Sequence, residues 1–106
     1  MTKAEKLRAL LNGSETILAP CAFDALSARC IEIAGFPMVG TTGFGIHGAY
    51  LGTPDNGLLT FNEMLSACTQ MAEAVGIPVM ADAEGGYGNA VNTYRTVREF
   101  EKAGLS

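Results

Sequence analysis

Short apolar runs alternate with helix-patterned segments along this chain, and this alternation limits the possible fold more than any other feature. The apolar runs that predict strands are 16–20 (TILAP), 36–42 (FPMVGTT) and 77–82 (IPVMAD). The segments that predict helices are 4–12, 25–35, 60–76 and 89–104. Strands separated by helices indicate right-handed βαβ crossovers and a parallel sheet, so the sequence predicts the α/β class.

Capping residues and apolar spacing locate the helices and predict which of their faces are buried. Asp24 is the expected N-cap of the second helix, and Thr60 with Glu63 forms a capping-box pattern. The clearest apolar stripe, on 60–76, consists of Phe61, Met64, Leu65, Cys68, Ala72 and Val75. The other apolar residues that we expect to face inward are Leu7, Leu10, Leu11, Leu26, Cys30, Ile33, Tyr94, Val97 and Phe100.

Glycine is frequent after the second expected strand, so we expect 43–57 to be a long glycine-rich loop. The only histidine, His47, lies in this segment. A general base is one interpretation of such a histidine, but a surface or packing role is favoured. Asp55 follows Gly-Thr-Pro, and its spacing alone indicates a turn.

Composition limits the class of protein and its partners. A chain of 106 residues with 48% hydrophobic residues is enough for one small domain. The net charge is −4 and no run of Lys or Arg occurs, so we expect neither nucleic acid nor an anionic membrane surface as a partner. No apolar run reaches the roughly 18 residues of a membrane span. The N-terminal segment lacks the features of a secretion signal, so we expect a cytoplasmic protein.

The three cysteines, Cys21, Cys30 and Cys68, are widely spaced and form no CxxC pair. Disulfides and a zinc site are therefore not expected. We expect all three to be small buried hydrophobic residues, and only Cys21, close to the first expected strand, could lie near a functional site.

Polar and glycine-rich segments directly follow each expected strand. They are 20–24 (PCAFD), 41–45 (TTGFG) and 82–88 (DAEGGYG). The carboxyl ends of parallel strands meet at one edge of a sheet, where functional sites form in the βα loops, so these segments are the candidate site. Free amides and hydroxyls in 41–45 and 85–88 suit an anionic ligand, although ordinary flexible turns are the alternative.

Asp82 and Glu84 are the most informative pair in these loops. Residues two apart in a strand point to the same side, so both carboxylates can face one point. Like charges repel at short range, and a divalent cation removes that penalty; Mg²⁺ prefers such oxygen ligands. The alternative is that Asp82 caps the next turn while Glu84 is solvated.

The motifs taken together resemble the isocitrate lyase/phosphoenolpyruvate mutase superfamily, in particular its short-chain, 2-methylisocitrate lyase-like members. The segments that carry the resemblance are APCAFDALSARCIEIAGFPMVGTTGFG, LGTPDNGLLTFNEML and IPVMADAEGGYGNAVNTYRTVREFEKAG. The resemblance implies a (β/α)8 TIM barrel, with 1–106 as its N-terminal part: about three βα units plus an N-terminal helix. It also implies Mg²⁺, a small 2-oxo or 2-hydroxy carboxylate substrate, chemistry through an enolate, and a homo-oligomeric full-length protein.

The resemblance also implies roles for particular residues. Asp82 and Glu84 match the two acids of a D-x-D-x-G-Y-G pattern that holds the metal, with Glu in place of the second Asp. Asp55 matches the acid of a G-x-P-D motif, and together with Asp82 it is a catalytic candidate. Thr42 and Gly43, with Phe44 beside them, match the segment that binds the substrate carboxylate. The loop after the acids corresponds to Gly86, Tyr87 and Gly88.

Some positions depart from the pattern of the superfamily. Gly40 stands where an aromatic residue is common, and Gly85 replaces a common Thr. The later strand acids and the Lys-x-Cys-Gly-His loop, which carries the acid/base cysteine in the lyases, would lie beyond Ser106. After the helix that ends near Gly104, we expect Leu105-Ser106 to lead into a fourth strand.

Three hypotheses follow for the function. The first is the N-terminal part of a magnesium-dependent lyase or mutase, inactive as a lone chain. The second is a non-catalytic, truncated α/β module that binds small carboxylates or associates with itself. The third, a flavodoxin-like sheet that binds a phosphorylated ligand, ranks last because the segment after the first expected strand is not rich in glycine.

Overall fold

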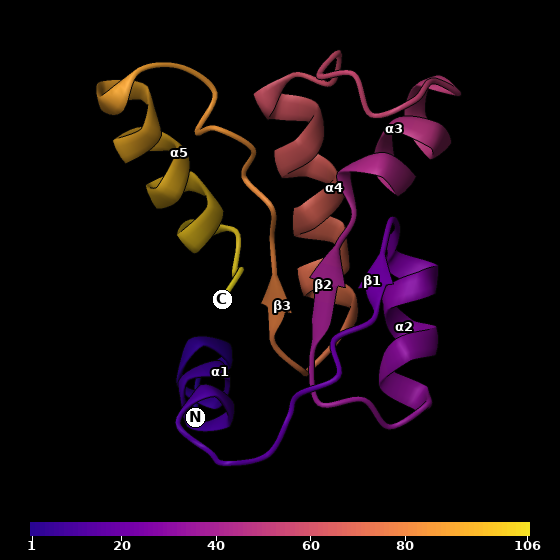
Figure 1. Cartoon of the computed structure of the whole chain (residues 1–106), viewed down its shortest axis with the longest axis vertical. Helices are drawn as coiled ribbons and strands as arrows, with labels where there is room; N and C mark the ends of the chain where they lie inside the picture. The colour runs from indigo at the N-terminus through magenta and orange to yellow at the C-terminus, as the bar shows by residue number, and fades with distance from the viewer.

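A three-stranded parallel sheet forms the centre of the computed structural model, which describes residues 1–106 (Figure 1). The strands are β1 (Cys21–Ala22), β2 (Val39–Thr41) and β3 (Val79–Met80), in the order β1-β2-β3. The register pairs Cys21 with Gly40 and Val39 with Val79. The predicted α/β class with parallel βα units is therefore confirmed.

Five helices surround the sheet: α1 (Lys3–Leu11), α2 (Ala25–Ile33), α3 (Gly43–Leu51), α4 (Phe61–Ala74) and α5 (Ala90–Lys102). In Figure 1, α2 lies next to β1 and α5 lies on the side of β3, while α1 lies below the end where the strands begin. None of these helices has both the length and the apolar character that crossing a bilayer requires.

The first strand lies later in the chain than the sequence predicts. The predicted strand 16–20 is wrong: these residues form no strand, and Leu18 is exposed. Pro20 has no N–H to donate, but its carbonyl accepts a hydrogen bond from Gly40 N–H at 2.9 Å. The hydrogen bonds between β1 and β2 therefore begin at the Pro20 carbonyl and continue along Cys21–Ala22. An apolar run by itself does not specify this starting point.

The segment 43–57 is not one long loop, because its first nine residues form α3. The hydroxyl of Thr42 accepts a hydrogen bond from Gly45 N–H at 3.1 Å and caps the helix. Gly52, with φ of 65°, ends it in the left-handed conformation. Glycine has a low helix propensity, but the cap at Thr42 and the left-handed stop at Gly52 define a helix between them.

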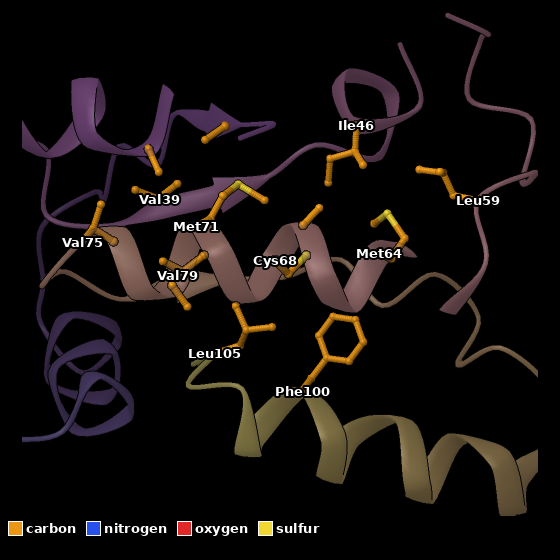
Figure 2. Packing of buried hydrophobic residues seen from close by; sticks show 14 residues of the cluster. Val39, Ile46, Leu59, Met64, Cys68, Met71, Val75, Val79, Phe100 and Leu105 are labelled. Atoms are coloured by element: carbon orange, nitrogen blue, oxygen red, sulfur yellow. The ribbon is translucent and has the colours of Figure 1, made fainter. Parts of the chain in front are cut away.

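The core lies between α4, the sheet and α5 (Figure 2). The stripe predicted on α4 is confirmed: Met64, Cys68, Ala72 and Val75 are buried. They pack in one cluster with Val39 and Val79 of the sheet and with Phe100 and Leu105 near the C-terminus. At the other end of α4, Lys3 donates to Ala72 O and Lys6 donates to Gly76 O at 3.0 Å, so two cations of α1 bind its terminal carbonyls.

The predicted inward face of α2 is wrong, and that of α5 is correct only for Phe100. On α2, Leu26 and Ile33 are 73% and 77% exposed, whereas Ala28 is fully buried. Its small side chain allows α2 to pack closely on α4. On α5, Tyr94 and Val97 are exposed, and Thr96 and Phe100 are the buried residues.

The last residues run alongside β3. Ser106 N–H donates to Val79 O at 2.9 Å, and Leu105 is buried in the core cluster. This backbone contact agrees with the expectation that Leu105-Ser106 leads into a further strand.

Candidate functional site

The segments that follow β2 and β3 are joined at the carboxyl edge of the sheet. Asp82 N–H donates a hydrogen bond to the hydroxyl of Thr41 at 2.9 Å, and Thr41 is buried. Thr42, the next residue, caps α3. The β3 loop and the start of α3 are therefore held side by side by one hydroxyl, as the edge argument predicts.

Asp82 and Glu84 lie in a turn rather than in an extended strand. β3 ends at Met80, and Glu84 N–H donates to Asp82 Oδ1 at 2.8 Å. Glu84 also has a φ of 50°, in the left-handed region. The expectation that strand alternation orients both carboxylates is therefore wrong, and the alternative that Asp82 caps the following turn is correct.

Glu84 and Asp55 nevertheless converge on one point, the Cα of Gly43. A methyl group on Gly43 would lie 3.2 Å from Glu84 Oε1 and 3.5 Å from Asp55 Oδ2. A side chain at position 43 would therefore contact both carboxylates and press on that of Glu84. The structure therefore brings together one residue from the start of α3, one from the segment before α4 and one from the β3 loop.

His47 connects the same residues from inside the molecule. Its side chain is almost fully buried, and Nδ1 lies 2.7 Å from Gly43 O and 3.4 Å from Asp55 Oδ1. Nε2 accepts a hydrogen bond from Leu59 N–H at 3.3 Å. A packing role is thus confirmed for His47, in a helix rather than in a loop, and a surface role is excluded.

Tyr87 places a buried hydroxyl close to the acids. Its hydroxyl has no hydrogen-bond partner, and its ring packs edge-on against Phe61 with centroids 5.6 Å apart. Burial raises the pKa of Tyr87 to about 12, and the negative charges of Glu84, Asp82 and Asp55 act in the same direction. All three carboxylates are therefore near enough to this phenol to act on its ionisation.

The carboxyl edge of the sheet, where the acids lie, is called the rim below. Cys68 lies below this rim, and its thiol is unreactive. Burial raises its pKa to about 11, which a hydrogen bond with Thr41 opposes and the charge of Asp82 reinforces. Cys21 and Cys30 are exposed, so the expectation that all three cysteines are buried is wrong for these two.

A cavity of about 330 Å³ opens beside the acids. Its walls are His47, Gly57, Leu59, Glu84, Gly85, Tyr87 and Gly88. Gly86 and Gly88 have positive φ values of 90° and 146°, and a side chain at Gly86 would collide with Thr93. Two of the three predicted loop residues therefore line this cavity, while Gly86 shapes it from behind.

Phe44, predicted beside the carboxylate-binding residues, is 69% exposed and does not line the cavity. The hydroxyl of Thr42 accepts the cap hydrogen bond of α3, which leaves its own hydrogen and the amides of Gly43 and Phe44 as the donors of this segment. The sequence placed Thr41 only in the segment 41–45 that suits an anion, and predicted neither its hydrogen bond with Asp82 N–H nor the Nδ1 contacts of His47. The adjacent pair Thr41-Thr42 was the available signal for Thr41.

The donor atoms at this edge of the sheet fit a hydrated magnesium ion better than a metal held by the protein alone. No three His, Cys, Asp or Glu side chains gather closely enough to hold a metal by themselves. The acids that reach this rim, Asp55, Asp82 and Glu84, offer only oxygen donors. Mg²⁺ takes one or two carboxylates and keeps several waters, so an open set of carboxylates fits this ion and does not fit zinc.

Comparison with known proteins gives a consistent result. The family model described as phosphoenolpyruvate phosphomutase matches residues 7–106. The 2,3-dimethylmalate lyase of Eubacterium barkeri is 49% identical over 106 residues, which are 100% of this chain and 37% of that protein. The oxaloacetate decarboxylase of Rhodopseudomonas palustris (strain BisB5) is 43% identical over 100 residues, 94% of this chain and 35% of that protein.

Among solved structures, a phosphonopyruvate hydrolase in complex with oxalate and Mg²⁺ superposes with a TM-score of 0.94 at 36% identity. The match covers 99% of this chain and 37% of that chain. This chain thus spans little more than a third of the length of the proteins that it matches.

Proposed function

This chain belongs to the phosphoenolpyruvate phosphomutase family, and from that premise we propose that it forms part of the active site of a magnesium-dependent lyase or mutase. The proposed substrates are 2-oxo or 2-hydroxy carboxylates, in which a C–C or P–C bond is made or broken through an enolate. The observation that carries this proposal is the convergence of the Glu84 and Asp55 carboxylates on Gly43, at the edge where Asp82 follows β3.

Asp82 and Glu84 would hold the ion, and Asp55 lies beside them as the second catalytic candidate after Asp82. When bound, Mg²⁺ would supply Lewis-acid stabilisation of negative charge on the substrate oxygen. The carboxylates themselves favour such an ion, because their like charges repel one another across a shared rim. Tyr87 and Gly88 line the cavity beside these acids, and Gly86 between them has a positive φ of 90°.

The substrate carboxylate is proposed to bind at the first turn of α3. The first N–H groups of a helix have no partner within the helix and attract anions. Thr42 caps Gly45 N–H, which leaves the amides of Gly43 and Phe44 to donate to a ligand. The Thr42 hydroxyl accepts from Gly45 and can still donate its own hydrogen to that ligand.

The names of two matching proteins support this substrate class. 2,3-Dimethylmalate is a 2-hydroxy acid and phosphonopyruvate is a 2-oxo acid. The hydrolase of phosphonopyruvate is described in complex with oxalate and Mg²⁺, and oxalate carries two adjacent oxygen-bearing carbons, as the enolate of such an acid does. A 2-methylisocitrate-like substrate falls in the same class.

Residues 1–106 are proposed to be part of a (β/α)8 barrel domain, three βα units plus α1, in a cytoplasmic homo-oligomeric enzyme. A rim built from three strands stays open to water, and water weakens the electrostatic stabilisation of an enolate. We therefore expect residues 1–106 alone to bind ligand weakly and to show no turnover.

The test is oxalate binding by the intact protein, measured calorimetrically with and without Mg²⁺. We expect binding that requires Mg²⁺, and a loss of affinity of at least about tenfold in Glu84→Gln and Asp82→Asn, because each removes one negative charge from the metal site. Glu73→Gln is the matched control, since Glu73 is an exposed acid on α4 outside the site.

Oxalate binding that ignores Mg²⁺, or equal affinities in the site variants and the control, would contradict the proposal. Magnesium-dependent binding without turnover of any 2-oxo or 2-hydroxy acid would instead favour the non-catalytic binding module.

A further inference from the structure

The feature that the proposed chemistry does not use is the buried imidazole of His47. Only 1% of this residue is exposed, which makes it more deeply buried than Thr41 and Thr96, the other polar residues of the interior. A buried polar ring needs a partner for each nitrogen, since a buried nitrogen without a hydrogen bond destabilises the folded state. Both nitrogens of His47 have partners, and all of the partners belong to the site or to its cavity.

The contacts of the two nitrogens define the tautomer. Leu59 N–H can only donate, so Nε2, 3.3 Å away, must be the unprotonated nitrogen. The proton then lies on Nδ1, which donates to Gly43 O at 2.7 Å. Asp55 Oδ1 lies 3.4 Å from the same nitrogen, close enough for the carboxylate charge to favour a proton there. The ring is thus neutral, with its donor directed to the site and its acceptor directed to the chain before α4.

These contacts join three segments that the sequence separates. Gly43 begins α3, Asp55 lies in the stretch that leaves it, and Leu59 precedes the Thr60 cap of α4. Gly43 is also the residue on which the carboxylates of Asp55 and Glu84 converge. A shift of the ring would therefore move the Gly43 backbone and the Asp55 carboxylate relative to Glu84.

We propose that His47 is a positioning residue of this site: its Nδ1–H fixes the Gly43 carbonyl and orients the Asp55 carboxylate, while Nε2 anchors the cavity wall at Leu59. The expected effect of this positioning on ligand affinity rests on the proposed function. His47 does not act as a general base, because the nitrogen that is free of a proton is occupied by Leu59 N–H inside the protein.

Two substitutions separate the two nitrogens. His47→Asn keeps an N–H donor at the place of Nδ1 and removes Nε2. His47→Gln places its amide near Nε2 and removes the donor to Gly43. We expect magnesium-dependent oxalate affinity of the intact protein to stay near wild type in His47→Asn and to fall at least about tenfold in His47→Gln, as for other residues that orient metal ligands.

A role in packing alone would lower thermal stability in both variants and would give them the same affinity. Equal affinities in His47→Asn and His47→Gln, with wild type still binding, would overturn the inference. Absence of oxalate binding by wild type would instead overturn the proposed function, so the two failures are distinguishable.

The tautomer provides a test that needs neither a folded variant nor an active enzyme. His47 is the only histidine of this chain, so its ring nitrogens are readily followed in long-range ¹H–¹⁵N spectra. We expect a neutral ring protonated at Nδ1 in the ligand-free protein at neutral pH. A ring protonated at Nε2, or at both nitrogens, would overturn the inference whatever the variants do.

Discussion

The hydroxyl group of Tyr87 lacks a hydrogen-bond partner within the protein. The oxygen is buried with no hydrogen-bond partner, and the nearby carboxylates raise the cost of ionising it. An unmet buried polar group costs about 1–3 kcal/mol unless a ligand or water satisfies it. The ring of Tyr87 thus packs against the core, while its hydroxyl is left to the site.

Cys68 gives a prediction for stability against pH. Its pKa in the folded protein, about 11, is raised above the ordinary value of 9.0, chiefly by burial. The folded state therefore keeps this proton between pH 9 and 11 while the unfolded chain releases it. Stability is complete below pH 9 and falls as pH rises to 11, by on the order of 2 kcal/mol from this thiol.

Urea unfolding between pH 8 and 11 measures this slope. Cys68→Ala should have a shallower slope than wild type, whereas Cys30→Ala, which removes an exposed thiol, should not change it. Tyr87 contributes with the same sign between pH 10 and 12, so a residual slope remains at the highest pH. An unchanged slope in Cys68→Ala would contradict the assignment.

Among the elements, α4 is the one against which α2, α5 and the sheet pack. It supplies much of the core, and its N-terminus carries a complete capping box: Glu63 N–H donates to Thr60 Oγ1 at 3.2 Å, and Thr60 N–H donates to Glu63 Oε1 at 3.2 Å. Thr60 directly follows Leu59, whose N–H binds His47. The Thr60 cap thus fixes the start of α4 and, through the neighbouring Leu59, one wall of the cavity.

Thr60→Ala should lower the free energy of unfolding by about 1 kcal/mol, because the cap hydroxyl satisfies a backbone N–H that is otherwise unpaired. Chemical denaturation measures this change. Thr16→Ala is the control, since Thr16 is exposed and outside any helix or strand. Equal stabilities of the two variants would show that water replaces the cap without cost.

The whole molecule exposes more surface than a folded protein of its mass usually does. Its accessible surface is 6291 Å² for 11.1 kDa, against about 5,700 Å² expected from the scaling of monomers. Large apolar side chains contribute to the excess, among them Leu26, Ile33 and Phe44. β1 and β3 are also the two outer strands of the sheet, and outer strands can pair with another chain.

Residues 1–106 alone should therefore associate as their concentration rises. The weight-average sedimentation coefficient should increase over the micromolar range, and added salt should not reverse this, because apolar contacts are not screened as charge pairs are. A constant monomeric sedimentation coefficient would contradict this prediction.

Much of the architecture could be predicted because it rests on local signals. The cap at Asp24, the capping box at Thr60 and the stripe along α4 all came from spacing and are all present. The family followed from the order of several loop motifs, and the match over residues 7–106 confirms it. The face of α2 and most of that of α5 could not be predicted, because Leu26 and Tyr94 are apolar in character but are largely exposed, and only Phe100 is buried as expected.

The sequence by itself determined the alternation of three strands with helices, except for α3, as well as the parallel sheet and the edge on which the acids lie, since these depend on periodicity and on caps a few residues away. Only the tertiary structure decided how those acids are arranged. Glu84 reaches Gly43 from a left-handed turn, and His47 ties Gly43, Asp55 and Leu59 together. Such contacts depend on how segments far apart in the sequence pack together, and no local sequence pattern specifies that packing.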